Sequence, residues 1–266
     1  MKKSLKSWIP PILVKLCHNL NLSGIRFTGN YSTWEEASKH TNGYESENIF
    51  ERVKLSAKKV KNGEFACERD SVLFDEPQYS WPSLACLMHV AACKQGRLSV
   101  LDFGGSLGSS YFLNKIFLND FDVEWSVIEQ PHFVDFGKKE ISNNVLKFYT
   151  DINECYLERK PNCLLLSSVI QYLEEPYQWL ETFVNLEVDF ILLDRMPFSK
   201  IQNEIIQVQN VPSSIYKASY PVHILREEKV VNLMKEAGYE LFERFSPDVG
   251  IETKFFYSLG LFFKKI

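Results

Sequence analysis

Residues 98–109 read Leu-Ser-Val-Leu-Asp-Phe-Gly-Gly-Ser-Leu-Gly-Ser, and this stretch decides the fold. Its apolar run, Leu98 to Phe103, carries Asp102 near the end and is followed by three glycines within five residues. The pattern is typical of a buried parallel strand that leads through a tight loop into a helix. Glycines in such a loop remove Cβ atoms, so a ligand can lie against the backbone.

A second acid stands at the tip of the next predicted strand. Residues 123–128, Val-Glu-Trp-Ser-Val-Ile, form an apolar stretch that ends in Glu129. A carboxylate at this position can accept hydrogen bonds from both hydroxyls of a ribose. The glycine loop and Glu129 together predict a nucleoside-containing cofactor.

Strands and helices alternate from Leu98 onward, and the predicted strands are almost continuously apolar. After the first two, we expect strands at residues 145–149, 163–168 and 190–194, and helices at residues 132–141 and 176–185. This alternation predicts an α/β fold with a parallel sheet covered on both faces. Residues 240–245 and 255–264 predict a closing antiparallel pair of strands.

Ligands of such sheets bind at the carboxyl ends of the strands. The residues expected there are Asp102, Glu129, Asp151, Ser168 and Asp194. Each acid has a second interpretation, because a carboxylate at a strand end can also cap the helix that follows.

The residues before this core are predicted to be mostly helical. One helix opens at Trp34, a second covers residues 46–61, and a third covers residues 80–94 with Pro82 in its first turn. We therefore divide the chain into an N-terminal arm with a helical cap, residues 1–95, and a Rossmann-like domain, residues 96–266.

The arm is basic and amphipathic. Residues 1–26 contain five lysines and arginines and no acid, and they carry an apolar face. Two interpretations remain open: the arm packs on the main domain, or it makes a peripheral contact with an anionic membrane surface.

Composition excludes several classes of protein. The net charge of −4 argues against a nucleic-acid-binding protein, which usually has a basic surplus. The six cysteines form no Cys-x-x-Cys pair, so we expect no metal site, and scattered thiols suit a reducing cytoplasm. No apolar segment is long enough to span a bilayer, and the N-terminus does not have the pattern of a signal peptide.

The glycine pattern distinguishes between two kinds of nucleoside cofactor. The dinucleotide pattern Gly-x-Gly-x-x-Gly fails because Phe103 stands where the first glycine belongs. Read as Asp-x-Gly-x-Gly-x-Gly, the loop runs from Asp102 to Gly108 with Ser106 in place of one glycine. This pattern resembles the first motif of the class I S-adenosylmethionine-dependent methyltransferases.

The resemblance implies a seven-stranded, mostly parallel sheet that ends in an antiparallel hairpin. It also implies the contacts of S-adenosylmethionine. Asp102 and the backbone of Gly104, Gly105 and Gly108 would hold the methionine half. Glu129 and Gln130 would hold the ribose, and Asp151 and Ile152 would lie beside the adenine.

A more specific resemblance extends from about residue 25 to the end of the chain. The motifs that carry it are residues 27–37, 68–74, 102–108, 167–174, 193–197 and 218–221. In combination they resemble a family of bacterial methyltransferases often associated with surface-polysaccharide gene clusters.

Residues for the acceptor come from the same motifs, which we expect to place them on loops rather than in strands. Arg69, Arg195 and Tyr220 are the candidates for acceptor binding, because a guanidinium can grip a phosphate or carboxylate by two hydrogen bonds. Asp70, His223 and Arg195 are the catalytic candidates, with Asp70 or His223 as the general base. Ser168 and Gln171 lie where related enzymes contact cofactor or acceptor. The alternative for an arginine beside an aspartate is a structural ion pair.

These observations predict a cytoplasmic enzyme. The alternative is an enzyme bound peripherally to the inner face of the membrane. It would transfer a methyl group from S-adenosylmethionine to a small molecule or to a sugar of a glycan precursor. Two other functions remain open on the same fold: an enzyme that uses a nucleotide sugar or dinucleotide, and a non-catalytic cofactor-binding or scaffold module.

Overall fold

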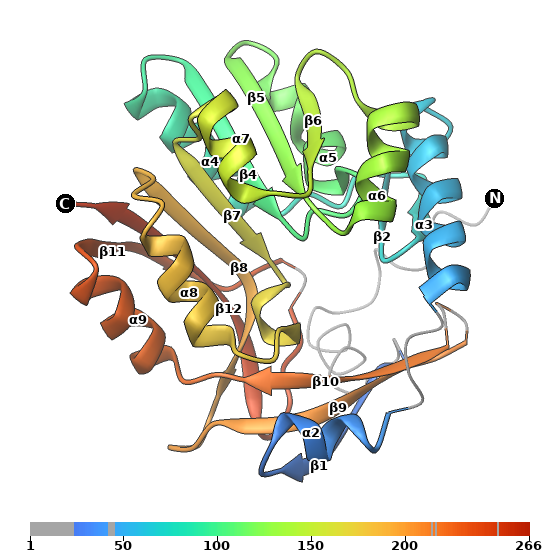
Figure 1. Cartoon of the computed structure of the whole chain (residues 1–266), viewed down its shortest axis with the longest axis vertical. Coiled ribbons are helices and arrows are strands. Elements are labelled where there is room, and N and C mark those ends of the chain that lie inside the picture. Colours follow the sequence, from blue (N-terminus) through green and yellow to red (C-terminus); the bar gives the residue numbers. More distant parts are fainter. Residues whose placement is uncertain (1–23, 42–45, 214, 216, 249) are drawn as a thin grey trace, which may run out of the picture.

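The computed structural model describes residues 24–41, 46–213, 215, 217–248 and 250–266. The strand predicted at residues 98–103 is the middle one of the five parallel strands of a seven-stranded sheet. The strand order is β11-β12-β8-β7-β4-β5-β6 (Figure 1). The strands are β4 (Arg97–Phe103), β5 (Asp122–Ile128), β6 (Leu146–Tyr149), β7 (Cys163–Ser167), β8 (Phe190–Ser199), β11 (Tyr239–Phe245) and β12 (Phe256–Lys265). β4 to β8 run parallel, whereas β12 is antiparallel to both β8 and β11. The predicted fold class is confirmed.

Helices cover both faces of this sheet. Alternate residues of each strand face opposite sides, and because the strands are almost continuously apolar, both faces have to be covered. In β7, Leu165 belongs to one core cluster, and Leu164 and Leu166 belong to the other. The first cluster includes residues of α4 (Trp81–Cys93), α5 (Ser109–Leu118) and α6 (Pro131–Phe136), which the π-helical turn η2 (Gly137–Ile141) continues. The second includes residues of α7 (Ile152–Arg159), α8 (Pro176–Val184) and α9 (Glu227–Glu236).

A second sheet, not predicted from the sequence, lies beside the carboxyl ends of the parallel strands (Figure 1). It consists of β1 (Arg26–Tyr31), β9 (Ile205–Val211) and β10 (Ala218–Ile224), all antiparallel. The short helix α2 (Trp34–Ser38), capped by the Thr33 side chain, packs against it. A separate apolar cluster of Ile205, Val222, Ile224 and Phe256 forms its core.

The strand β8 reaches both sheets. Its first five residues pair with β7, up to Asp194 opposite Ser167. The strand then continues along β12 to Ser199. Beyond Arg195 it also meets the residue after β10, because Leu225 donates a backbone hydrogen bond to Pro197 at 3.0 Å. The strand predicted at residues 190–194 is therefore longer than expected.

The described part of residues 1–95 is helical only in part. The predicted helices are present as α2, α3 (Ser46–Lys61) and α4, but a hairpin of β2 (Cys67–Arg69) and β3 (Val72–Phe74) lies between α3 and α4. β1 pairs with β9 across the expected domain boundary, and the division into residues 1–95 and 96–266 stays a prediction. The basic arm, apart from residues 24–26, lies outside the described residues.

In the described part of the chain, no helix is both long enough and apolar enough to cross a membrane. The same residues contain no cluster of three or more His, Cys, Asp or Glu side chains that could hold a metal ion.

Candidate active site

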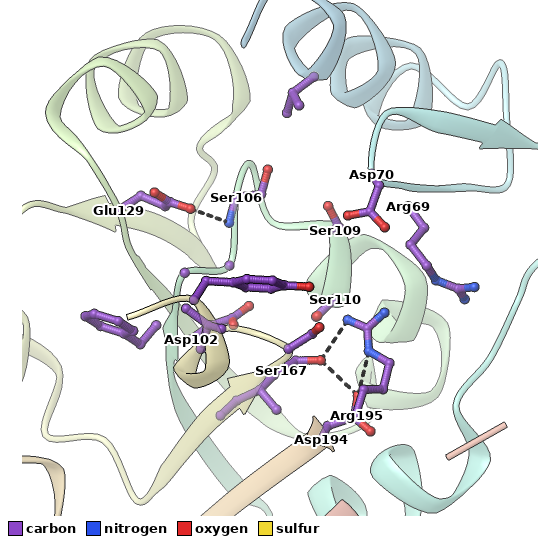
Figure 2. Close-up of a pocket in the computed structure, with 18 of the residues that line it drawn as sticks. Arg69, Asp70, Asp102, Ser106, Ser109, Ser110, Glu129, Ser167, Asp194 and Arg195 are labelled. Atoms are coloured by element: carbon purple, nitrogen blue, oxygen red, sulfur yellow. Dashed lines mark hydrogen bonds and ion pairs between the residues drawn. The ribbon is translucent and has the colours of Figure 1, made fainter. Parts of the chain in front are cut away.

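A cavity of about 980 Å³ opens at the carboxyl ends of the five parallel strands. Phe103, Ile128, Thr150, Ser167 and Asp194 line it at the ends of, or just after, the parallel-paired parts of β4, β5, β6, β7 and β8. Its other walls come from the β2–β3 hairpin, from α3 and α4, and from β9 and β10 of the second sheet. Figure 2 shows the polar side chains that gather around it. The structure thus places the cavity where the strand order predicted a ligand.

The glycine loop after β4 is shaped by close contacts. A Cβ atom on Gly105 would lie 2.5 Å from the carboxyl carbon of Asp102, so the loop can fold over this acid only with glycine there. A Cβ atom on Gly104 would lie 2.5 Å from Cγ2 of Val169. Gly108 is the N-cap of α5 and packs against Leu146 instead of lining the cavity.

Ser106, which replaces a glycine of the expected pattern, adopts the backbone conformation that a glycine would favour. Its φ angle is 54°, in the left-handed region. Its backbone N–H donates a hydrogen bond of 3.2 Å to Oε1 of Glu129. The substitution therefore preserves the shape of the loop.

Asp102 is buried beneath this loop, with an exposed fraction of 1%. Its Oδ2 accepts a hydrogen bond of 2.9 Å from the indole nitrogen of Trp125, which is also buried. Burial and, to a smaller extent, the nearby Glu129 raise the pKa of Asp102, whereas Trp125 and Arg195 lower it, and the net result is a pKa of about 7. This carboxyl group therefore titrates near neutral pH.

Glu129 follows β5 and faces the cavity beside the glycine loop (Figure 2). Its two carboxylate oxygens accept hydrogen bonds from the backbone N–H groups of Ser106 and Gln130, at 3.2 and 2.9 Å. Burial raises the pKa of Glu129, and these two bonds lower it. Each oxygen keeps a lone pair for a further donor, as a ribose diol would require.

The residues predicted beside an adenine have a structural role. The Asp151 side chain caps α7 by accepting a hydrogen bond of 2.8 Å from the backbone N–H of Glu154. Asp151 and Ile152 do not line the cavity, although Thr150 does. The helix-capping interpretation is thus observed for Asp151, and its contact with a cofactor stays a prediction.

The ends of β7 and β8 carry a connected group of polar side chains. Ser167 donates a hydrogen bond of 2.8 Å to Oδ2 of Asp194 and accepts one of 2.9 Å from Arg195. Nε of Arg195 lies 3.4 Å from the same Asp194 oxygen. Asp194 is only 5% exposed, and its Oδ1 has no hydrogen-bond partner within the described part of the chain. Ser168 lines the cavity next to them and accepts a hydrogen bond of 2.8 Å from Gln171, which lies behind it.

The β2–β3 hairpin brings a second arginine to the cavity. Its turn residues Asp70 and Ser71 have φ angles of 50° and 62°. Glu68 fixes the turn by accepting a hydrogen bond from the backbone of Ser71 at 3.0 Å, and it also contacts the hydroxyl of Ser109 at the start of α5. Burial raises the pKa of Glu68. Arg69 makes one long hydrogen bond, 3.4 Å, to the carbonyl of Gln78.

A wall of hydroxyl and amide groups comes from the second sheet. Tyr172 donates a hydrogen bond of 3.0 Å to the side chain of Gln209, which in turn donates one of 3.2 Å to the hydroxyl of Tyr220. The two tyrosine rings meet edge to face at 5.2 Å. All three residues line the cavity.

The expectation that the acceptor residues lie on loops is wrong for four of the five. Arg69 is the last residue of β2, Arg195 lies inside β8, and Tyr220 and His223 lie in β10. Only Asp70 occupies a turn. The structure nevertheless brings Arg69, Asp70, Arg195 and Tyr220 to the same cavity.

His223 is not among the residues that line this cavity. Its ring stacks on Trp34 at 4.8 Å, and its Nε2 lies 3.1 Å from the carbonyl oxygen of Glu174. Burial lowers the pKa of His223. A catalytic role for His223 stays a prediction, but its contacts are those of a packed side chain.

Sequence reasoning missed several residues of the site. Glu68 and Tyr172 lie in the motifs of residues 68–74 and 167–174, but neither was predicted as a site residue. Asp194 was expected at the end of a strand, without a role. Gln209 had one signal, the alternation of polar residues in 205–211, which is typical of a strand with one polar face.

Models of known protein families and curated proteins gave no match with the chain. Solved structures did. One is the N-terminal domain of EvdMO1 in the presence of SAH and D-fucose, 12% identical, with a TM-score of 0.49 and coverage of 84% of this chain and 98% of that one. A second is an S-adenosylmethionine-dependent methyltransferase from Clostridium acetobutylicum. It is 11% identical, with a TM-score of 0.46 and coverage of 68% of this chain and 90% of that one. A third is magnesium protoporphyrin IX methyltransferase from Synechocystis with bound SAM, which is 14% identical, with a TM-score of 0.45 and coverage of 84% of this chain and 87% of that one. Likenesses of this size do not identify a function, which must come from the residues of the cavity.

Proposed function

We propose that the chain is an S-adenosylmethionine-dependent methyltransferase that acts on a small molecule or a glycan precursor. One observation carries the proposal: Asp102 and Glu129, from adjacent parallel strands, both line a cavity that a glycine loop enters. Two carboxylates suit a ligand that brings an ammonium group, a sulfonium group and a ribose diol.

The cavity fits such a cofactor by its own geometry. The open lone pairs of Glu129 are acceptors for the ribose hydroxyls, and its orientation is fixed by the backbone of Ser106 and Gln130. Gly104 and Gly105 present bare backbone along the cavity wall, beside the buried carboxyl of Asp102. The side chain of Phe103 packs on Trp179 and Phe183, with ring centroids at 5.2 and 4.9 Å, where a dinucleotide-binding loop has a glycine.

S-Adenosylmethionine supplies an electrophilic methyl group, and its transfer breaks one S–C bond while a new bond forms to an oxygen or nitrogen of the acceptor. The protein has to align the acceptor with this methyl group and to exclude water. An acceptor atom that carries a proton has to lose it, and Asp70, which lines the cavity from its exposed turn, is our candidate for the base that takes it. Ser168 lines the cavity beside the ends of β7 and β8, and it is our candidate for a contact with cofactor or acceptor.

The proposal is tested by calorimetric titration of the full chain with S-adenosylmethionine and S-adenosylhomocysteine. We expect dissociation constants of the order of micromolar. Glu129→Gln should weaken binding by about tenfold or more, because it removes a charged hydrogen-bond acceptor. Glu154→Gln, at an exposed carboxylate outside the cavity, is the matched control. Folded protein that gives no heat with either ligand would refute the proposal.

The link to surface polysaccharides rests on the resemblance of the sequence motifs, and a place at the inner membrane face rests on the basic residues 1–26. A flotation assay with vesicles that contain anionic lipid tests the membrane contact. Binding that is lost when Lys2, Lys3 and Lys6 are replaced by glutamine would support it, and no flotation of the full chain would rule it out.

A further inference from the structure

Two guanidinium groups from distant parts of the chain line one side of the cavity. Arg69 ends β2, and Arg195 lies in β8, where this strand leaves its parallel partner. In Figure 2 both lie on the side of the cavity away from Glu129. Their charges interact: burial lowers the pKa of Arg69 most, and the positive charge of Arg195 is the second cause that lowers it.

The charges of these arginines are only partly compensated. Arg195 shares one oxygen of Asp194 with Ser167, and the distance from Nε to that oxygen, 3.4 Å, is long for a hydrogen bond. Arg69 forms no ion pair among the described residues, not even with its neighbour Asp70, and its one hydrogen bond is to a carbonyl. A half-buried cation without a carboxylate ion pair, as Arg69 is, is costly unless a ligand supplies the negative charge.

The two arginines lie on the side of the cavity away from Glu129 and the glycine loop. The acids nearest them are Asp70, Asp194 and the buried Asp102, whose pKa Arg195 lowers. Arg195 also lies near Tyr172, in the hydroxyl and amide wall that Tyr172, Gln209 and Tyr220 form. Such a wall suits a polar, hydroxylated molecule.

We propose that Arg69 and Arg195 together bind an oxyanion of the acceptor, a phosphate or a carboxylate. The planar guanidinium group matches the geometry of both anions and can hold either by two hydrogen bonds. The identity of the bound molecule as the methyl acceptor rests on the proposed function. The anion site itself does not depend on it. The acceptor class is then a phosphorylated or carboxylated small molecule.

The test is a calorimetric titration of the full chain with inorganic pyrophosphate and, separately, with malonate, both at constant ionic strength. We expect at least one of them to bind, and Arg69→Gln to weaken this binding by about tenfold or more, as the loss of a charged hydrogen bond implies. The preference between the two probes tells whether the site is built for phosphate or for carboxylate. Arg226→Gln, at an exposed arginine paired with Glu228 outside the cavity, is the matched control and should bind as the wild type does.

Arg195→Gln should have an effect similar to that of Arg69→Gln, but it also removes a bond to Ser167, so its fold has to be checked by circular dichroism. Equal binding by wild type and Arg69→Gln, or no binding of either anion by wild type, would overturn the proposal. A parallel titration with S-adenosylhomocysteine separates the two hypotheses. Cofactor binding without anion binding refutes only the anion site, and the reverse result refutes only the proposed function.

Discussion

The indole of Trp125 donates a hydrogen bond of 2.9 Å to the carboxyl group of Asp102, and both side chains are buried. Trp125 stands in β5, and Asp102 stands in the neighbouring β4. The bond therefore ties the two strands whose ends carry the glycine loop and Glu129. Burial raises the pKa of Asp102 although this bond lowers it, and the net shift can be measured.

Asp102 should make stability depend on pH. Its pKa rises from 3.8 to about 7 on folding, so between pH 4 and pH 7 the folded state binds more protons than the unfolded state. Stability then falls as the pH rises through this window. We expect the free energy of unfolding of the wild type, measured in urea, to fall relative to that of Asp102→Asn from pH 4 to pH 7. Two curves that stay parallel would show that Asp102 has an ordinary pKa.

Gly105→Ala should damage the cofactor site more than the fold. The added Cβ atom would lie 2.5 Å from the carboxyl carbon of Asp102, which has to move. We expect the affinity for S-adenosylhomocysteine to fall about tenfold or more, which corresponds to about 1.4 kcal/mol. Gly63→Ala is the control: nothing lies within 4 Å of its Cβ position, so it should keep wild-type affinity, although its φ of 77° should lower stability.

Ser106→Gly should leave stability unchanged or raise it slightly. Relief of the left-handed conformation contributes about 1–2 kcal/mol, and the greater freedom of glycine in the unfolded chain offsets about 0.4–1 kcal/mol of it. The hydrogen bond to Glu129 comes from the backbone and remains. Ser106→Val, in contrast, should lower the free energy of unfolding by about 1–3 kcal/mol, because a β-branched residue is strained at this φ. Equal stabilities of the two variants in urea would contradict this explanation.

His223 should destabilise the fold at acid pH. Burial holds its pKa below the ordinary 6.5, so the unfolded state binds the proton first as the pH falls below that value. Stability is then lost as the pH falls through 6.5. We expect the wild type to lose free energy of unfolding relative to His223→Gln between pH 7.5 and pH 5.5. Unchanged S-adenosylhomocysteine binding by this variant would agree with the position of His223 outside the cavity, and lost binding would not.

The seven-stranded sheet could be predicted because its signals are local. Each parallel strand is a short apolar run, and Asp102 and Glu129 come directly at or after such runs. Backbone geometry then places the ends of neighbouring strands together. The glycine loop was predictable for the same reason, since Gly105 is close in sequence to the acid that it has to accommodate.

The second sheet could not be predicted, because its pairing is not local. Arg26 pairs with Asn210, and the three strands carry many polar residues, among them the buried Gln207 and Gln209. The prediction that Arg195 lies on a loop was wrong for a related reason. The acid and arginine that follow residues 190–193 look like the end of a strand, yet pairing with β12 carries β8 on to Ser199.

The place of β9 and β10 in the chain has an evolutionary consequence. They are inserted between β8 and α9, and β1 precedes every strand of the parallel sheet. Mutations can therefore remodel the wall of Gln209 and Tyr220 while the order of the cofactor-side strands stays as it is. Under the proposed function, exchange of these strands would change the part of the acceptor that meets this wall and leave Arg69 and Arg195 in place, so grafting them between related chains is a route to altered specificity.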